Sequence, residues 1–253
     1  MQPGVMPPSL EAERPAWVRD ALGNPTGRGV RIGVIDSGWD RTQPAPAVAP
    51  GIGLVDPGDD LALCLSDDDH DRNGHGTACT DLILRSAPDA IIQPIRVFGE
   101  RLETDPIILK AAIQWAIEQR CHLVNISLGT LRADALYMLY AVCEEARRAG
   151  VLLVAATHNS HAWSYPAIFE NVISVGAAPL ASPFDYLYRP DEAVECLARG
   201  RNQLIRGLGG KMDVKSGTSF AAPNITGLIA LFLERHPGAP LTDVRHLLAQ
   251  YSR

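Results

Sequence analysis

Apolar residues gather in short, nearly continuous runs along the chain, and segments with a helical spacing lie between these runs. Each run is rich in Val, Ile, Leu and Ala, which is typical of strands that are covered on both faces. Turn residues or polar residues flank most of these apolar runs. The runs are Val30–Asp36, Ile91–Val97, His122–Leu128, Val151–Ala156 and Asn171–Val175.

The intervening segments carry apolar residues at every third or fourth position. Asp105–Pro106 opens one predicted helix, because proline is favoured in a first helical turn. A second extends from about Ala133 to Ala149 and ends at Gly150, a favourable C-terminal cap. We expect a short helix around Leu10–Leu22 and a last helix over Leu241–Gln250. This alternation predicts an α/β fold with a doubly wound, mainly parallel sheet and helices on both of its faces.

The length of 253 residues suits one large domain, and 46% hydrophobic residues supply its core. Residues 1–28 are rich in Pro and Gly and are expected to form an N-terminal extension. Residues 29–253 are expected to form the domain. The segment from Ala178 to Lys215 is turn-rich and less periodic, which predicts hairpins at the edge of that domain.

Charge and targeting signals narrow the class of protein. The net charge of −6 argues against nucleic acid or an anionic membrane as the main partner, because both favour a basic face. No stretch reaches the roughly 20 apolar residues that span a bilayer. The segment Met1–Asp20 lacks the pattern of a secretory signal. The cysteines have no metal-ligand spacing and indicate reduced thiols in a cytoplasmic protein; they are Cys64, Cys79, Cys121, Cys143 and Cys196.

Two motifs place a candidate acid and a candidate base at the ends of predicted elements. Asp36 closes the first strand, and ligands of doubly wound sheets bind at the carboxyl ends of strands. A carboxylate there can orient an imidazole, although strand-end Asp residues also cap turns. His75 begins a helical run between Gly74 and Gly76, which let a substrate approach closely. The alternatives for His75 are a helix cap and a metal ligand.

A third motif, Ser216-Gly217-Thr218-Ser219-Phe220-Ala221-Ala222-Pro223, enters an apolar helix that continues through Leu233. Ser219 is expected at the start of this helix, where unpaired backbone N–H groups stabilise a developing negative charge. Its own N–H is a candidate donor to such a charge. A serine that only caps the helix is the alternative, but the early Pro223 is unusual for a simple cap.

The motifs Asp-Ser-Gly, His-Gly-Thr and Gly-Thr-Ser-x-Ala-x-Pro, in this order, resemble the subtilisin family of serine peptidases over roughly residues 28–250. The resemblance implies an endopeptidase that acts on peptides or proteins. It implies that Ser219 attacks the scissile carbonyl, that His75 transfers the proton and that Asp36 orients His75. No metal or other cofactor takes part in that chemistry.

The resemblance extends to the oxyanion and to the substrate. Asn159 matches the family's asparagine that donates to the oxyanion, beside the N–H of Ser219. A structural asparagine in a turn is the alternative. The segment Ser127-Leu128-Gly129 matches the one that pairs with substrate as an added β-strand.

The wall of the pocket for the residue before the cut departs from the family. Thr157 and His158 stand where relatives have Ala-Gly. A histidine there is expected either to narrow the pocket and make it polar or to point into solvent. In the first case the enzyme does not simply prefer large apolar residues before the cut.

The chain also lacks features of many relatives. The stretch after His75 has too few residues and oxygen ligands for the family's calcium loop. The run Asp67-Asp68-Asp69 is expected to be a solvated loop, with cation binding as the alternative. Cys79 matches a cysteine beneath the catalytic histidine of proteinase K-like members and is expected to be buried.

Only about 28 residues precede the Asp36 strand, and this absence of a pro-domain resembles intracellular and peptide-maturing members. The segment Met1–Pro15 is a candidate to lie in the cleft and restrain the enzyme. We therefore expect a selective cytoplasmic or precursor-processing protease. The alternatives are a peptide-binding pseudoprotease, and a ligase or acyl transferase that uses the same serine.

Overall fold

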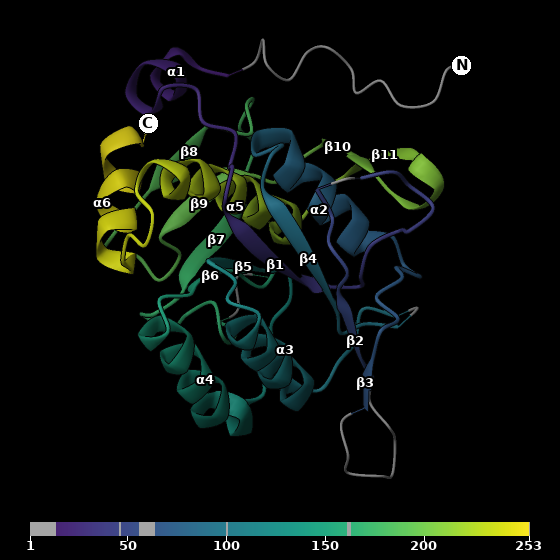
Figure 1. Cartoon of the computed structure of the whole chain (residues 1–253). Helices are drawn as coiled ribbons and strands as arrows, with labels where there is room; N and C mark the ends of the chain where they lie inside the picture. The colour runs from purple at the N-terminus through teal and green to yellow at the C-terminus, as the bar shows by residue number, and fades with distance from the viewer. Residues whose placement is uncertain (1–13, 46, 56–63, 100, 161–162, 253) are drawn as a thin grey trace.

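The computed structural model describes residues 14–45, 47–55, 64–99, 101–160 and 163–252. Within these residues, a nine-stranded sheet crosses the middle of the molecule in the order β3-β2-β4-β1-β5-β6-β7-β9-β8 (Figure 1). The strands are β1 (Arg31–Asp36), β2 (Ile52–Val55), β3 (Cys64–Ser66), β4 (Ile91–Arg96), β5 (Leu123–Ile126), β6 (Leu152–Ala156), β7 (Ile173–Ala178), β8 (Tyr186–Tyr188) and β9 (Cys196–Arg199).

The sheet is parallel except at its two edges. Strand β1 pairs in parallel with β4 and β5, so that Ile32 lies opposite Ile92 on one side and Leu123 on the other. Only the edge strands β3 and β8 are antiparallel to their neighbours. Every residue of β5 and β6 is buried, which explains why these strands appear in the sequence as continuous apolar runs.

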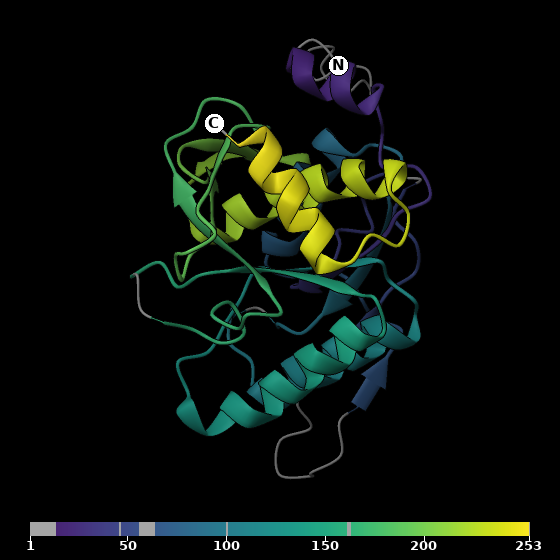
Figure 2. The same cartoon turned by 90° about the vertical axis from the view of Figure 1, so that its left-hand side faces the viewer.

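Helices cover both faces of this sheet (Figures 1 and 2). One apolar core joins the sheet to α1 (Ala16–Leu22), α2 (His75–Ser86), α5 (Thr218–Arg235) and α6 (Leu241–Tyr251). A second core on the opposite face joins it to α3 (Pro106–Glu118) and α4 (Leu136–Arg148). The predicted α/β fold with a doubly wound, mainly parallel sheet is therefore confirmed.

Helix α5 lies at the centre of the larger core. Its residues from Phe220 to Leu233 are all buried, as expected for a helix that is apolar on every side. It packs against α2 and against strands β5, β6, β7 and β9. Because its interior is fixed by so many neighbours, the first turn of α5, which carries Ser219, has a defined position at the edge of the sheet.

Some elements differ from the sequence-based expectation. Strands β2 and β3 were not predicted, and the helix expected from Ala133 begins with a 3-10 turn, Ala133–Ala135. The segment 178–215 holds two antiparallel pairs, β8 with β9 and β10 (Gln203–Arg206) with β11 (Met212–Lys215). Strand β9 also pairs in parallel with β7, so this segment extends the main sheet.

The described part of the N-terminal extension packs on the domain. The ring of Trp17 in α1 stacks on Tyr251 of α6 with centroids 5.0 Å apart, and it also contacts Phe232 of α5. The predicted helix around Leu10–Leu22 is thus α1 from Ala16, and residues 10–13 lie outside the described residues. The predicted domain boundary at residue 28 stays a prediction, as does the placement of Met1–Pro15 in the cleft.

None of the described helices combines the length and the apolar composition that crossing a membrane requires.

Candidate active site

The predicted site residues come from neighbouring elements at one edge of the sheet. Asp36 is the last residue of β1, Ser127 follows β5 directly, and Asn159 lies three residues beyond β6. His75 is the first residue of α2 and Ser219 is the second residue of α5. Because the strands are parallel, their carboxyl ends and the following helix starts meet at the same edge.

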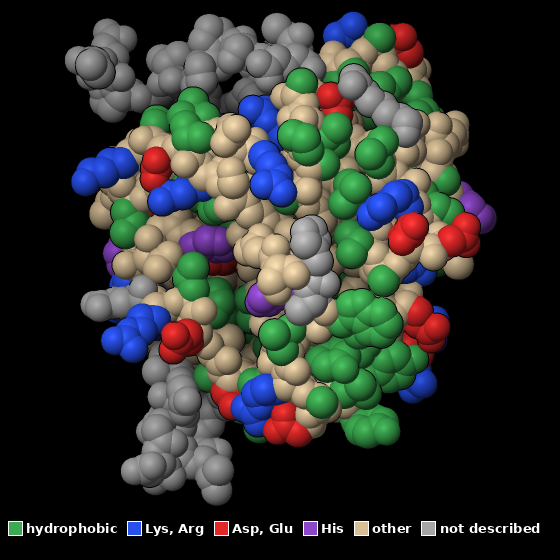
Figure 3. Space-filling model, turned by 180° about the vertical axis from the view of Figure 1, so that it is seen from behind, with side chains coloured by type: hydrophobic (Ala, Val, Ile, Leu, Met, Phe, Trp, Pro, Cys, Tyr) green, Lys and Arg blue, Asp and Glu red, His purple; other side chains and the backbone are tan. Residues whose placement is uncertain are grey.

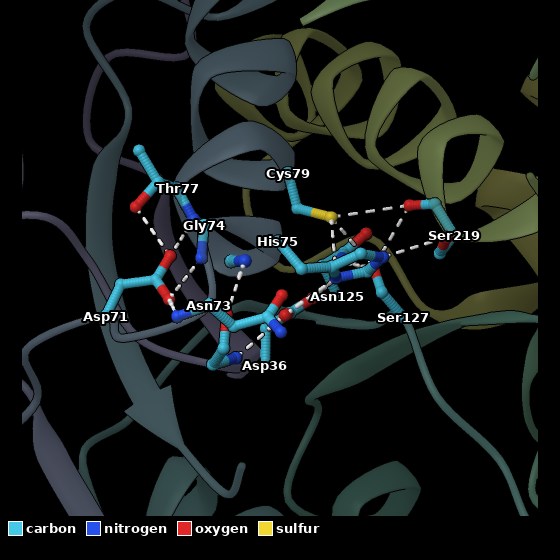
Figure 4. Close-up of polar contacts among 12 residues, drawn as sticks. Asp36, Asp71, Asn73, Gly74, His75, Thr77, Cys79, Asn125, Ser127 and Ser219 are labelled. Atoms are coloured by element: carbon cyan, nitrogen blue, oxygen red, sulfur yellow. Dashed lines mark hydrogen bonds and ion pairs between the residues drawn. The ribbon is translucent and has the colours of Figure 1, made fainter. Parts of the chain in front are cut away.

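Asp36, His75 and Ser219 form a continuous chain of polar contacts (Figure 4). Nδ1 of His75 lies 2.8 Å from Oδ1 and 3.0 Å from Oδ2 of Asp36. Nε2 of His75 lies 3.0 Å from Oγ of Ser219. With Nδ1 donating to the carboxylate, Nε2 is an acceptor for the hydroxyl proton. This arrangement is the one needed to convert a serine hydroxyl into a nucleophile.

The charge of Asp36 controls the protonation of His75. Asp36 is fully buried, and its Oδ1 accepts a hydrogen bond of 2.7 Å from the N–H of Ser37. Burial alone would lower the pKa of His75, but the charge of Asp36 and the hydrogen bond to it raise that pKa well above its usual value. The imidazolium that forms during proton transfer is therefore stabilised.

A buried carboxylate that sequence analysis did not single out shapes the turn before His75. Asp71 accepts hydrogen bonds from the N–H groups of Asn73 (2.9 Å), Gly74 (2.7 Å) and Thr77 (2.9 Å) and from the hydroxyl of Thr77 (2.6 Å). These bonds satisfy N–H groups at and just before the start of α2, which have no partner within the helix. Gly74 has a φ of 95°, which favours glycine. Asp71 is therefore a positioning residue for His75.

Pro223 explains how the carbonyl of Ser219 is held. Proline has no N–H, so the carbonyl four residues earlier, that of Ser219, loses its helical partner. The hydroxyl of Ser127 donates to that carbonyl at 3.2 Å, and Sγ of Cys79 lies 3.4 Å from it. The unusual early proline thus ties the nucleophile's backbone to the segment after β5 and to α2.

A further chain of hydrogen bonds fixes Ser127. Nδ2 of Asn125 donates to Oγ of Ser127 at 2.8 Å, and Oδ1 of Asn125 accepts from Thr226 in α5 at 2.9 Å. Asn125 and Thr226 are fully buried. This buried network connects the interior of α5 to its first turn through β5, and sequence analysis did not predict it.

Cys79 lies beneath His75, as expected, and is buried. Its Sγ is 3.8 Å from Nδ1 of His75. Burial raises the pKa of the Cys79 thiol to about 11, so the group is a neutral thiol near neutral pH. Among the described residues, Asp36, His75 and Cys79 are grouped closely enough to ligate a metal ion. Ligation there would require breaking the contact between Asp36 and His75.

The side chain of Asn159 has a defined orientation. Its Oδ1 accepts from the N–H of Thr218 at 3.0 Å and from the Thr218 hydroxyl at 3.2 Å. The Nδ2 group is therefore left to donate to another partner. The N–H of Ser219 lies in the first turn of α5, where backbone donors have no helical acceptor. Asn159 and Ser219 both line the same cleft.

A cleft of about 440 Å³ passes over this site. Figure 3 shows a hollow on this face with a histidine side chain visible at its border. All of the residues predicted from sequence except the buried Asp36 line it; they are His75, Ser127, Leu128, Gly129, Thr157, His158, Asn159 and Ser219.

For His158 the two expectations were a polar wall of the pocket and a side chain that points into solvent, and the structure has features of both. This side chain is exposed, yet it lines the cleft, and its Nδ1 contacts Oγ of Ser160 at 2.7 Å. A second polar group of the cleft was missed by sequence analysis. Ser164 is only 2% exposed, and its Oγ has no hydrogen-bond partner within the described part of the chain.

The acidic run differs from the expected solvated loop. Asp69 is buried, accepts from the N–H of Gly51 and forms an ion pair with Arg41. Asp68 pairs with Arg72 at 2.6 Å and lies 3.4 Å from Arg96. Arginines therefore neutralise these acids.

The turn between α2 and β4 is short, with residues 87–90 alone joining the two elements. That the enzyme needs no calcium or other cofactor stays a prediction.

Comparisons with known proteins show the family of the chain. Residues 27–252 match the family model described as the subtilase family (Peptidase S8). A thermostable alkaline protease of Halalkalibacterium halodurans is 27% identical over 88% of this chain, which spans 62% of that relative's length.

Two solved structures share the fold. A cold adapted subtilisin-like serine proteinase superposes with a TM-score of 0.72 at 23% identity, covering 90% of this chain and 83% of that one. A lanthipeptide protease superposes with a TM-score of 0.70 at 22% identity, covering 91% and 82%. Because the family model covers residues 27–252, the chain belongs to the subtilase family of serine peptidases.

Proposed function

We propose that this protein is a serine endopeptidase in which Asp36, His75 and Ser219 act as the catalytic triad. The observation that carries the proposal is the unbroken contact from the Asp36 carboxylate through both ring nitrogens of His75 to the Ser219 hydroxyl. Each of the two steps is at hydrogen-bonding distance. In this assignment His75 takes the proton of Ser219 as Oγ attacks the scissile carbonyl, and later delivers it to the leaving amine.

The oxyanion is assigned to two donors, Nδ2 of Asn159 and the N–H of Ser219. The hydrogen bonds that Thr218 donates to Oδ1 of Asn159 support this assignment, because they hold the amide so that Nδ2 is free to donate. The peptide before the cut would lie along Ser127-Leu128-Gly129 and add a strand there.

Removal of the side-chain oxyanion donor gives a specific expectation. The Asn159→Ala variant should lose on the order of 10²–10³ in kcat, a loss measured for this donor in subtilisin, while KM changes little. Steady-state kinetics with a fluorogenic peptide measure both constants. Gln250→Ala, which removes an exposed amide side chain in α6 away from the cleft, is the matched control. A loss confined to KM would contradict the oxyanion assignment.

The raised pKa of His75 predicts the pH dependence. Burial opposes the positive charge on His75, but Asp36 overcomes this effect, so the ring stays protonated above its usual pKa of 6.5. Only the neutral ring can accept the Ser219 proton, so kcat/KM should fall as the pH falls through this raised pKa. A profile with an uncharged substrate should show its acid limb above about pH 6.5. A limb near pH 4 would mean that another group titrates.

We also propose that the peptidase is selective and processes precursor peptides in the cytoplasm. The pocket before the cut supports selectivity, because the unpaired hydroxyl of Ser164 and the exposed His158 give it polar groups. The fold similarity to a lanthipeptide protease fits a processing role. Cys79, Cys121, Cys143 and Cys196 are free and buried, which fits a reducing compartment.

One experiment tests both the reaction and the selectivity. The protein is incubated with a peptide library in the presence of free amine acceptors, and mass spectrometry identifies the products. Hydrolysis gives two fragments with new carboxyl and amino ends, whereas ligation or acyl transfer joins the acyl fragment to the acceptor. We expect hydrolysis at a restricted set of sites. Cleavage with a plain Phe or Leu preference before the cut would contradict the pocket assignment, and no turnover would favour the pseudoprotease.

A further inference from the structure

A second cavity of about 530 Å³ borders the cleft on the other side of Asn159. Thr157, Asn159 and Thr218 line both hollows, so the two are contiguous. Along the edge of the sheet the ends of β5, β6, β7 and β9 follow one another. The cleft lies over the ends of β5 and β6, and the second cavity lies over the ends of β6, β7 and β9, where it includes Gly176 and Gly200.

Two arginines, Arg189 and Arg201, are the charged residues that line this cavity, and we call it the arginine pocket. Neither guanidinium forms an ion pair with a carboxylate of the described residues. Nη2 of Arg189 donates to the carbonyl of Val194 at 3.2 Å, which holds the side chain in place. Nε of Arg189 is buried and has no partner among the same residues.

An unpaired, buried N–H of a charged group is unfavourable unless a ligand satisfies it. Several other arginines of this acidic chain pair with carboxylates, as Arg245 does with Glu195 and Arg41 with Asp69. The buried, unsatisfied Nε of Arg189 lies in a cavity that Asn159, the proposed oxyanion donor, also lines. A guanidinium presents parallel N–H groups that match the two oxygens of a carboxylate.

We propose that the arginine pocket binds a carboxylate on the part of the substrate that follows the cleaved bond. This inference rests on the proposed function, in which Ser127-Leu128-Gly129 holds the residues before the cut. In that orientation, the substrate residues after the cut continue past Ser219 and Asn159 toward the arginine pocket, which Arg189 and Arg201 line. The carboxylate belongs either to an Asp or Glu side chain or to the C-terminus of a short substrate.

Cleavage kinetics test the proposal. Quenched fluorogenic peptides carry either Glu or Gln at each of the first three positions after the cut, and a parallel pair ends in a free acid or an amide. The wild type should favour the carboxylate form at one of these positions by roughly 10- to 100-fold in kcat/KM. The Glu/Gln pairs and the acid/amide pair distinguish the two sources of the carboxylate.

Variants assign the preference to the pocket. Arg189→Gln and Arg201→Gln should each reduce the ratio of the carboxylate to the amide substrate toward one. Lys211→Gln removes a positive charge from an exposed turn that lines neither hollow, and it should keep the wild-type ratio. A ratio of one in the wild type, or a ratio that survives in both arginine variants, would overturn the proposal. Thermal melting of each variant shows that it is folded.

Binding to the Ser219→Ala variant separates this proposal from the proposed function. This variant lacks the nucleophile but retains both hollows, so fluorescence anisotropy measures affinity for the same labelled peptides without cleavage. Tighter binding of the carboxylate forms, lost on adding Arg189→Gln, supports the arginine pocket even if the wild type cleaves nothing. Equal binding of Glu and Gln peptides, with cleavage intact in the wild type, overturns the pocket while the peptidase assignment stands.

Discussion

The Ser219→Ala variant is expected to lose peptidase activity by a factor on the order of 10⁶ in kcat, the size of loss measured on removing the nucleophile of subtilisin. The methyl group of the introduced alanine cannot form an acyl bond with the substrate, although His75 and Asp36 remain in contact. Rates of peptide hydrolysis at a fixed pH, measured with purified protein at high concentration, check this expectation.

Two controls make that result specific. Thr242→Ala removes a hydroxyl from an exposed position in α6 that does not line the cleft, and it should keep nearly full activity. The melting temperature of Ser219→Ala should stay close to that of the wild type, because the variant loses the contact of the hydroxyl with His75 and keeps the backbone contacts of residue 219. Activity within tenfold of the wild type would show that another group is the nucleophile.

The Asp36→Asn variant is expected to lose about 10⁴ in kcat. An amide at this buried position would donate to Nδ1 of His75, and the ring proton would then move to Nε2. A protonated Nε2 cannot accept the proton of Ser219 across the 3.0 Å contact. The loss would therefore come from the wrong tautomer in an otherwise similar geometry.

Asp89→Asn provides the matched control, since Asp89 is a carboxylate on the surface that pairs with Arg28. It should leave kcat and the pH profile unchanged. Steady-state kinetics on both variants separate an effect at the triad from a general loss of charge. If Asp36→Asn retained more than a tenth of the wild-type kcat, Asp36 would not be the orienting acid.

The sequence was most informative where chemistry and local structure require the same residues. Asp36, His75 and Ser219 each stand at the end of a strand or the start of a helix that apolar spacing predicts, and parallel topology then brings them together. Asn159 came instead from the resemblance to the subtilisin family, and it lies three residues beyond β6. The strands themselves were predictable because strands that are buried on both faces appear as nearly continuous apolar runs.

Long-range contacts could not be predicted in this way. Asp71 stands only four residues before His75, but its four hydrogen bonds depend on the three-dimensional turn before α2. The link from Thr226 to Ser127 through Asn125 joins residues about a hundred positions apart. Their polar side chains carry no periodic signal, because each is buried by a different element.

The segment around Arg189 and Arg201 gave the weakest prediction. Short strands with many turns indicated only hairpins at an edge, and the parallel pairing of β9 with β7 was not visible in the spacing. That pairing is what carries Arg201 to the edge of the sheet beside Asn159. The acidic run was misread for a related reason, since its arginine partners Arg41 and Arg96 are distant in sequence.

Covalent labelling of the nucleophile tests the central claim most directly. The wild-type protein is treated with a fluorophosphonate, digested and mapped by mass spectrometry. We predict one adduct per chain, on Ser219, which forms more slowly in Asp36→Asn and is absent in Ser219→Ala. An adduct on another residue, or equal labelling of the wild type and Ser219→Ala, would contradict the assignment of Asp36, His75 and Ser219 as the catalytic triad.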